Sequence, residues 1–458
     1  MIFSIFLIFV YCFLTFTVIK KIFNGDTFYL LVYLTLFLPF YSLFQLFIFK
    51  TSENIYLVNL IRYSKDFVIF SSFLVLVFGY KKNIIFREFK YTFLDKLVVA
   101  FSLISIIYTL IPLGLASFFD KVIYLKNILL ISVVYFIGKS TNISVEKFKF
   151  LKKTLIFLLI LAFCVASVEY LSGLHLHFIL DYSNYNFVFY DTPSSGNFGL
   201  SWTFERGPDS PRFGSFFSNP LEYSANLLLF LTIPLFHIIN VKTKRFYHFF
   251  LLILIFISFY FAYSRASIFS GILMILFALI YNKDFKFFIY LFLTTLFFLL
   301  LIYLFIPDDT LYYVIDTFTF NESSSLSHLL EWIQGGISIY ENPFGIGLAM
   351  SGNASGVDQA IKVGGENQFL IYGVQMGLVF MLLYSVMLFK AIFDSMNLYK
   401  SLVNYQKELS FIGGMTKFGL LIPLFTANAE LYLFISLFSW FLIGYIQNLK
   451  ITKALNNY

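Results

Sequence analysis

The chain has 458 residues, of which 59% are hydrophobic and 12% are charged. Soluble domains carry about 25% charged residues, so this composition excludes a water-soluble globular protein. The formal net charge of +7 does not indicate nucleic-acid binding, because the lysines and arginines lie mostly between alternate pairs of long apolar runs, as the positive-inside rule describes.

Those apolar runs predict an all-α, polytopic membrane protein in which residues 1–458 form a single transmembrane domain. A spanning helix needs about 20 apolar residues, and about 12–13 segments reach that length. The first has no basic n-region and no small-residue cleavage site, so we expect a retained helix and not a signal peptide. In chain order the segments are 2–19, 27–49, 60–80, 94–114, 117–138, 151–170, 218–241, 246–263, 266–282, 285–306, 367–393, 410–427 and 430–448.

The positions of the cations predict the orientation of the helices. Most lysines and arginines, Lys417 among them, are expected on the cytoplasmic side together with the C-terminus. An odd number of helices then places the N-terminus outside. Three cations run against the pattern: Lys50, Arg62 and Lys65. Two long segments with few cations, 171–217 and 307–366, are left on the other side, and we call them the first and second outer loops.

The cysteines and histidines predict neither a disulfide framework nor a metal centre. Cys12 and Cys164 both lie inside apolar segments, so they cannot build such a framework. His175 and His177 form an H-x-H pair, but no third histidine or carboxylate follows at ligand spacing. We therefore expect no metal and no other cofactor.

The first outer loop is rich in aromatic residues, Trp202 among them, and ends in two arginines. Aromatic side chains are typical of an interfacial belt, but their flat faces also suit sugar rings, and composition does not separate these interpretations. Arg206 and Arg212 stand just before a spanning helix, beside prolines and glycines that fix the backbone. An arginine held in this way is suited to a planar, bidentate grip on a phosphate.

A third arginine, Arg265, lies in a very tight turn between the apolar segments 246–263 and 266–282. An arginine at the centre of a membrane helix costs about 2.5–3.5 kcal/mol on insertion scales, although one near a helix end can snorkel to the interface. The predicted topology places Arg265 at the same depth as Arg206 and Arg212, which favours a functional role.

The second outer loop is expected to contain an amphipathic helix over 323–340. A run of serines from Ser323 is typical of an N-cap, and apolar residues follow at helical spacing: Leu326, Leu330, Ile333 and Ile337. We expect this apolar face to pack onto the outer ends of the spanning helices, so that the helix forms a lid. His328 and Glu331 are three residues apart and so face the same way. The glycine-rich residues 345–365 predict a mobile loop.

Glu366 stands where the chain re-enters the membrane after the second outer loop. A carboxylate at the head of a helix is commonly a residue that only interacts with the helix dipole. Its place at the edge of the large outer loop also fits a functional role. The sequence leaves both interpretations open.

Four stretches resemble motifs of the bacterial O-antigen polymerase and ligase family of polytopic membrane glycosyltransferases. Arg212-Phe213-Gly214 through Asn219-Pro220 is similar to that family's R-x-G-x-F-x-N-P start of a helix, and Ser264-Arg265 is similar to its S-R pair. Trp332 through Asn342-Pro343-Phe344-Gly345-Ile346-Gly347 is similar to its W…N-P-x-G-x-G segment. Glu366-Asn367-Gln368-Phe369-Leu370, with Gly373 and Gly377, is similar to its H/E-N-x-[FY]-L…G…G signature.

This chain departs from the family pattern at two positions. Ligase-type members tend to carry His where this chain has Glu366, and an arginine often found upstream of the Trp is replaced at best by His328. Both departures favour a polymerase of lipid-linked repeat units over an O-antigen ligase, which is the nearest alternative.

The resemblance implies a metal-independent glycosyl transfer in the bacterial inner membrane, with the site facing the periplasm. The donor would be a glycan on undecaprenyl diphosphate, and the acceptor a sugar hydroxyl of an incoming lipid-linked unit. Membrane lipid and, optionally, a chain-length regulator are the further partners. Arg212 and Arg265 would stabilise the departing diphosphate, Glu366 would be the base and His328 the second candidate for that role. The substrate-binding residues would be Arg206, Asn367, Trp202 and Glu331.

A flippase or another transporter of lipid-linked oligosaccharides is the alternative from a different class. Such a protein needs polar or charged residues near mid-membrane and broken helices in paired positions. The apolar segments consist mostly of Leu, Ile, Phe and Val, with Lys126 and Glu169 as exceptions. This favours the glycosyltransferase, and the arginines grouped at one membrane face disfavour a scaffold without chemistry of its own.

Overall fold

The computed structural model describes residues 2–78, 90–191, 194–207, 210–241, 245–283, 323–352, 357 and 361–456. Most of this part of the chain is helical, and its strands form one short antiparallel hairpin, β1 (Glu205–Gly207) with β2 (Ser210–Pro211). The all-α class expected from the sequence is therefore confirmed.

The helices coincide with the predicted membrane segments, except that segment 285–306 lies outside the described residues. Within those residues, eight helical units are long and apolar enough to cross a bilayer. They are α2 (Phe28–Phe37) with α3 (Tyr41–Ser52), α6 (Phe93–Leu110), α7 (Phe118–Lys139), α8 (Val145–Ser172), α11 (Pro220–Asn240), α17 (Gln368–Ser401), α18 (Asn404–Gly419) with α19 (Leu421–Thr426), and α20 (Leu433–Asn456). The other segments correspond to α1 (Ile2–Phe23), α4 (Ile55–Phe78), α12 (Arg245–Ala262) and α13 (Arg265–Tyr281).

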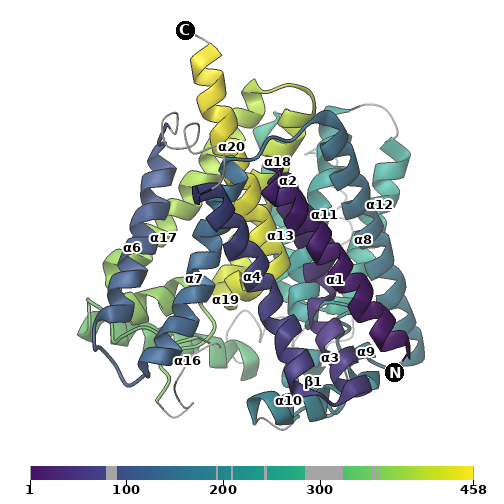
Figure 1. The fold of residues 1–458 in the computed structure, drawn as a ribbon, viewed down its shortest axis with the longest axis vertical. Coiled ribbons are helices and arrows are strands. Elements are labelled where there is room, and N and C mark those ends of the chain that lie inside the picture. The colour runs from purple at the N-terminus through teal and green to yellow at the C-terminus, as the bar shows by residue number, and fades with distance from the viewer. Residues whose placement is uncertain are drawn as a thin grey trace, which may run out of the picture.

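The described parts of the two outer loops lie at the same end of the bundle, opposite the C-terminus (Figure 1). We call this the loop end. It contains α9 (Leu176–Ile179), α10 (Tyr182–Tyr190), the 3-10 helix η2 (Trp202–Phe204) and the hairpin from the first outer loop, and α16 (Ser323–Glu341) from the second. Which side of the membrane the loop end faces stays a prediction from the charge pattern.

In the interior, helix backbones approach one another closely. A Cβ added to Gly444 of α20 would lie 1.9 Å from the carbonyl oxygen of Tyr135 in α7, and one added to Gly138 of α7 would lie 2.1 Å from that of Phe441 in α20. Small residues allow membrane helices to approach in this way. The reciprocal pair of glycines fixes α7 against α20.

Several charged residues inside the bundle form pairs. Lys139 of α7 lies 2.5 Å from Asp95 of α6, and both side chains are buried. Lys417, assigned to the cytoplasmic side by the charge pattern, is fully buried in α18, 3.7 Å from Glu430 and 4.0 Å from the ring centroid of Trp440. Counting charges does not show this burial, which a carboxylate from another segment compensates; the side of the membrane stays a prediction.

The long helix α17 is interrupted at Gly377, whose φ of 87° lies in the left-handed region that favours glycine. The interruption divides the helix into a short arm, 368–376, and a long arm, 378–401. Backbone groups on either side of the interruption lose their helical partners and need others, because an unsatisfied group in the membrane is costly.

The loop that follows α16 supplies those partners. The N–H of Leu378 donates to the carbonyl of Pro343 at 3.0 Å, and the carbonyl of Val374 accepts from the N–H of Ile346 at 2.8 Å. The N-P-x-G-x-G segment is therefore a backbone plug for the broken helix.

A mobile loop was expected over the glycine-rich stretch, but the described beginning of that stretch is packed. A Cβ on Gly345 would lie 2.5 Å from the carbonyl oxygen of Gln375, and one on Gly347 would lie 2.3 Å from that of Leu113. Leu348 is fully buried. These glycines allow two backbones to approach closely. Glycine content alone does not distinguish this role from flexibility.

The expected amphipathic helix is present as α16, but its packing face was predicted wrongly. Leu326, Leu330, Ile333 and Ile337 are 43%, 51%, 49% and 52% exposed. The opposite side, which carries small and polar residues, packs on α17: Gly335 approaches Leu370, and Ile339 approaches Gly373. In a membrane protein an apolar face can be satisfied by lipid, so helical periodicity does not show which face is buried inside.

Candidate functional site

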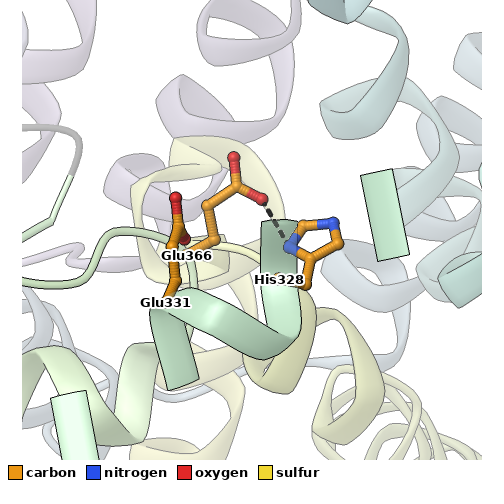
Figure 2. Close-up of side chains that lie close together, drawn as sticks. All are labelled: His328, Glu331 and Glu366. Carbon is orange, nitrogen blue, oxygen red and sulfur yellow. Dashed lines mark ion pairs between the residues drawn. The ribbon is translucent and has the colours of Figure 1, made fainter. Parts of the chain in front are cut away.

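The candidate site lies at the loop end, where α16 meets the segment that begins α17. Helical spacing places His328 and Glu331 one turn apart on α16, and Glu366 comes from the residues just before α17 (Figure 2). His328 Nδ1 is 2.9 Å from Glu366 Oε2, which makes a direct contact between two residues far apart in the sequence. The second oxygen of Glu366 points away from the imidazole.

Asn367, and not Glu366, caps α17. The side-chain oxygen of Asn367 accepts hydrogen bonds from the N–H groups of Phe369 and Leu370, at 3.0 and 3.2 Å. Such a cap satisfies backbone donors that the first turn of a helix leaves without partners. The carboxylate of Glu366 is thereby left available to His328. The substrate-binding role predicted for Asn367 stays a prediction beside this structural one.

Glu331 completes a cluster of three ligand-type side chains. Its carboxylate, the His328 imidazole and the Glu366 carboxylate offer atoms that all lie within 4.8 Å of one another. Burial, followed by the negative charge of Glu366, raises the pKa of Glu331, while His328 and Lys362 act in the opposite direction. Within the described residues, Glu331 Oε2 is buried and has no hydrogen-bond partner.

The hydrogen bond to Glu366 is the main reason that the pKa of His328 is raised. Burial opposes this shift, the charges of Glu366 and Glu331 add to it, and the charge of Arg265 opposes it. The raised pKa favours a charged imidazolium, which makes the contact with Glu366 a charge-assisted hydrogen bond. The influence of Arg265 also connects the first residue of α13 to this cluster.

One histidine and two carboxylates are donors that a divalent cation accepts. The His328–Glu366 contact engages two of these donors with each other, so a cation would have to displace that hydrogen bond. The absence of a metal from the reaction stays a prediction.

The hairpin of the first outer loop brings the other two arginines to the turn between α12 and α13. The N–H of Phe213 donates to the carbonyl of Phe261 at 3.0 Å, and the guanidinium of Arg206 lies 4.2 Å from the ring centroid of Tyr263. Arg265 begins α13 directly after this turn. Arg206, Arg212 and Arg265 are therefore grouped around one tight turn, whereas their joint contact with a diphosphate stays a prediction.

The H-x-H pair of the first outer loop belongs to an aromatic cluster. The ring of His175 stacks on that of Phe213 with centroids 4.9 Å apart, and the ring of His177 lies 4.8 Å from that of Phe204. Both histidines are buried, and burial lowers the pKa of His175 to about 4 and that of His177 to about 3. Two neutral imidazoles thus help to hold the segment that carries Arg206 and Arg212.

Trp202 is 59% exposed, while its neighbour Phe204 is buried. An exposed indole at the loop end fits both an interfacial belt and a face for a sugar ring. The substrate-binding role of Trp202 stays a prediction.

Sequence reasoning named Trp332 only as part of a motif, without a site role, and it missed Tyr432. Trp332 lines the same recess as Glu331 and Glu366, and within the described chain its buried indole nitrogen has no hydrogen-bond partner. Tyr432 lies between α19 and α20, and burial together with the charges of Glu366 and Glu222 raises the pKa of its phenol. The short interruption between the last two apolar segments, 410–427 and 430–448, is the only sequence feature near Tyr432, and it does not single out that residue.

No family model matches this chain, and no curated protein matches it significantly. The geometry of the site and the resemblance of the sequence motifs are therefore what indicates a function.

Proposed function

We propose that this protein polymerises lipid-linked oligosaccharide repeat units, such as those of O-antigen or a similar surface polysaccharide, in the bacterial inner membrane with the loop end facing the periplasm. The observation that carries the proposal is the His328–Glu366 contact of 2.9 Å. It joins the residue that opens the Glu366 motif to a histidine four residues before the Trp332 motif, and the charge of Arg265, from a third motif, acts on that histidine.

The proposed reaction forms one glycosidic bond and breaks one bond to phosphate. The oxygen of an acceptor sugar hydroxyl attacks the anomeric carbon of the donor glycan, and its proton passes to the carboxylate of Glu366. The bond between the anomeric carbon and the diphosphate oxygen breaks, and undecaprenyl diphosphate leaves with the electron pair. Arg265, Arg212 and Arg206 would stabilise the negative charge that gathers on the leaving group.

The polar atoms without partners in the recess support a hydroxyl-rich ligand. Glu331 Oε2 is a buried acceptor and Trp332 Nε1 is a buried donor, and neither has a hydrogen-bond partner within the described residues. Leaving such groups unsatisfied costs about 1–3 kcal/mol each. A sugar hydroxyl offers both a donor and an acceptor and would satisfy either one.

Transport of the same lipid-linked glycan is less well supported, although the interior holds more charge than the sequence analysis recognised. From the sequence, only Lys126 and Glu169 were named as charged residues within the apolar segments. Asp66 of α4 is also buried, 3.1 Å from Lys65 and 2.6 Å from Lys126. Glu222 at the start of α11 is also buried, and it accepts a hydrogen bond from Ser218. Charges compensated in this way stabilise contacts between helices.

The proposal is tested with a strain that lacks the protein, complemented by variants. We expect the deletion to leave single repeats on the final acceptor, and Glu366→Gln to do nearly the same. Glu341→Gln is the matched control, because Glu341 is exposed at the far end of α16 and makes the same change of charge. A deletion strain with no capped product would identify a ligase instead. A deletion strain whose polysaccharide ladder on a gel is normal would refute both the polymerase and the ligase.

A further inference from the structure

A cavity of about 460 Å³ lies at the end of the bundle opposite the candidate site, between the last turns of α17 and α20. Figure 1 shows the C-terminal end of α20 at this end of the bundle, away from α16. The residues that line it include three lysines, one aspartate, and apolar and small polar side chains: Lys390, Lys450, Lys453, Asp394, Phe393, Asn397 and Leu398.

The cavity carries an excess of positive charge. Asp394 is 3% exposed and pairs with Lys390 and Lys450, at 2.9 Å in each case. Lys453 donates to the carbonyl of Ser401, the last residue of α17, at 3.0 Å. Three lysines and one aspartate leave two positive charges, so an anion can bind here without displacing the buried pairs.

An apolar stripe on the outward side of α17 leads directly to this cavity. Its side chains recur at intervals of three and four residues, and all are exposed: Val379 69%, Leu382 52%, Val386 47%, Phe389 55% and Phe393 61%. In a helix that spans the bilayer, such a stripe faces acyl chains. Phe393 belongs both to the stripe and to the cavity lining.

We infer that the cavity binds the phosphate headgroup of an anionic glycerophospholipid, with its acyl chains lying along the stripe of α17. Lysine ammonium groups bind phosphate as point charges, and basic pockets between membrane helices are suited to anionic headgroups. The site is far from the candidate active site and does not depend on the proposed function. It would hold the ends of α17 and α20 together through a bound lipid.

The test measures lipid retained by the full-length protein. The purified chain is reconstituted in nanodiscs of phosphatidylcholine with or without phosphatidylglycerol, returned to detergent, and its bound phospholipid is identified by native mass spectrometry. We expect retention of phosphatidylglycerol over phosphatidylcholine. A lysine near an anionic headgroup contributes about fivefold in affinity, so Lys453→Gln should weaken retention about fivefold and Lys450→Gln/Lys453→Gln about 25-fold.

The matched control is Lys96→Gln/Lys149→Gln, which removes two exposed lysines outside the cavity. It should retain phosphatidylglycerol as the wild type does. Lys450 also pairs with Asp394, so the single variant Lys453→Gln, which leaves that pair intact, keeps the test valid if the double variant unfolds. Equal retention by the wild type and Lys453→Gln would overturn the inference. So would displacement of the lipid by inorganic phosphate alone, since the acyl contacts would then contribute nothing.

Discussion

Replacing Glu366 and His328 separately and together should show whether they act as one unit. Their contact of 2.9 Å is the length expected of a charge-assisted hydrogen bond. Glu366→Gln keeps an oxygen that accepts from the imidazole but removes the base, so polymer yield should fall on the order of a hundredfold.

His328→Gln should have a smaller effect, because it removes a positioning contact and not the base. A hydrogen bond to a charged group contributes about 1.5–3 kcal/mol, or about 10- to 150-fold. The side chain of Glu366 is 39% exposed, and solvent screening places the loss near the lower end, at about tenfold. If the two residues act as a unit, the double variant should lose no more than Glu366→Gln alone. Independent contributions would multiply to about a thousandfold.

The assay is the gel-resolved ladder of polysaccharide from each strain, normalised to the amount of protein in the membrane. Losses that multiply in the double variant would refute the joint action of the pair. Near-normal ladders from Glu366→Gln would remove Glu366 from the base role and promote His328.

The same pair should make the activity fall at alkaline pH. The raised pKa of His328 means that its charged form, and the stability it contributes, is fully present below pH about 6.5 and is lost as the pH rises through the raised value. Activity of the wild type in membrane vesicles should therefore decline on the alkaline side. His328→Gln should lack that decline, and an identical profile in both proteins would contradict the assignment.

Three further predictions concern other parts of the molecule. Arg265→Lys should lose activity, because the point charge of lysine lacks the bidentate fork of arginine. The loss should be about 2.7–4 kcal/mol of transition-state stabilisation. Full-length polymer from this variant would mean that Arg265 only anchors the helix. Gly377→Ala should lower the free energy of unfolding in detergent by about 2–5 kcal/mol, because its Cβ would lie 2.4 Å from the Pro343 carbonyl oxygen and its φ is left-handed; an unchanged melting temperature would contradict the backbone plug. Acid should destabilise the first outer loop, because the unfolded histidines take up protons below pH about 6.5 whereas His175 and His177 resist until about 4 and 3. The cost at pH 5 is about 4 kcal/mol for the pair, and His175→Phe/His177→Phe should reduce this acid sensitivity.

The spanning helices were predictable because the length and spacing of apolar runs depend on the bilayer alone. The turn at Arg265 was predictable for the same reason, since two such runs leave no room for a loop. The His328–Glu366 contact was not predictable from local pattern, because it joins α16 to the start of α17 through tertiary packing. Helical spacing could only place His328 and Glu331 on a common side.

The failures share one physical cause, which is a partner that local sequence does not show. The leucine face of α16 was expected to pack inward, but lipid is an equally good partner for Leu330 and Ile333. Lys417 was counted with the cations of one membrane side, whereas it is buried and Glu430 compensates its burial from a neighbouring segment. Gly345 was expected to confer mobility, but it allows two backbones to touch. In each case the sequence shows the property of a residue while the partner that decides its role lies elsewhere in the fold.

The plug in the broken helix has a consequence for the order of biosynthesis. The long arm of α17, residues 378–401, extends about 36 Å at 1.5 Å per residue, which is enough to cross a hydrocarbon core of about 30 Å without the short arm. The short arm, which follows Glu366 and the cap residue Asn367, is thus not needed for membrane insertion. The plug around Pro343 is synthesised before the long arm and can dock only once the long arm is present. The Leu378 amide therefore gains its partner, the Pro343 carbonyl, only after insertion. The reacting end of the molecule would then be assembled after its transmembrane scaffold, by docking of a segment that was synthesised earlier.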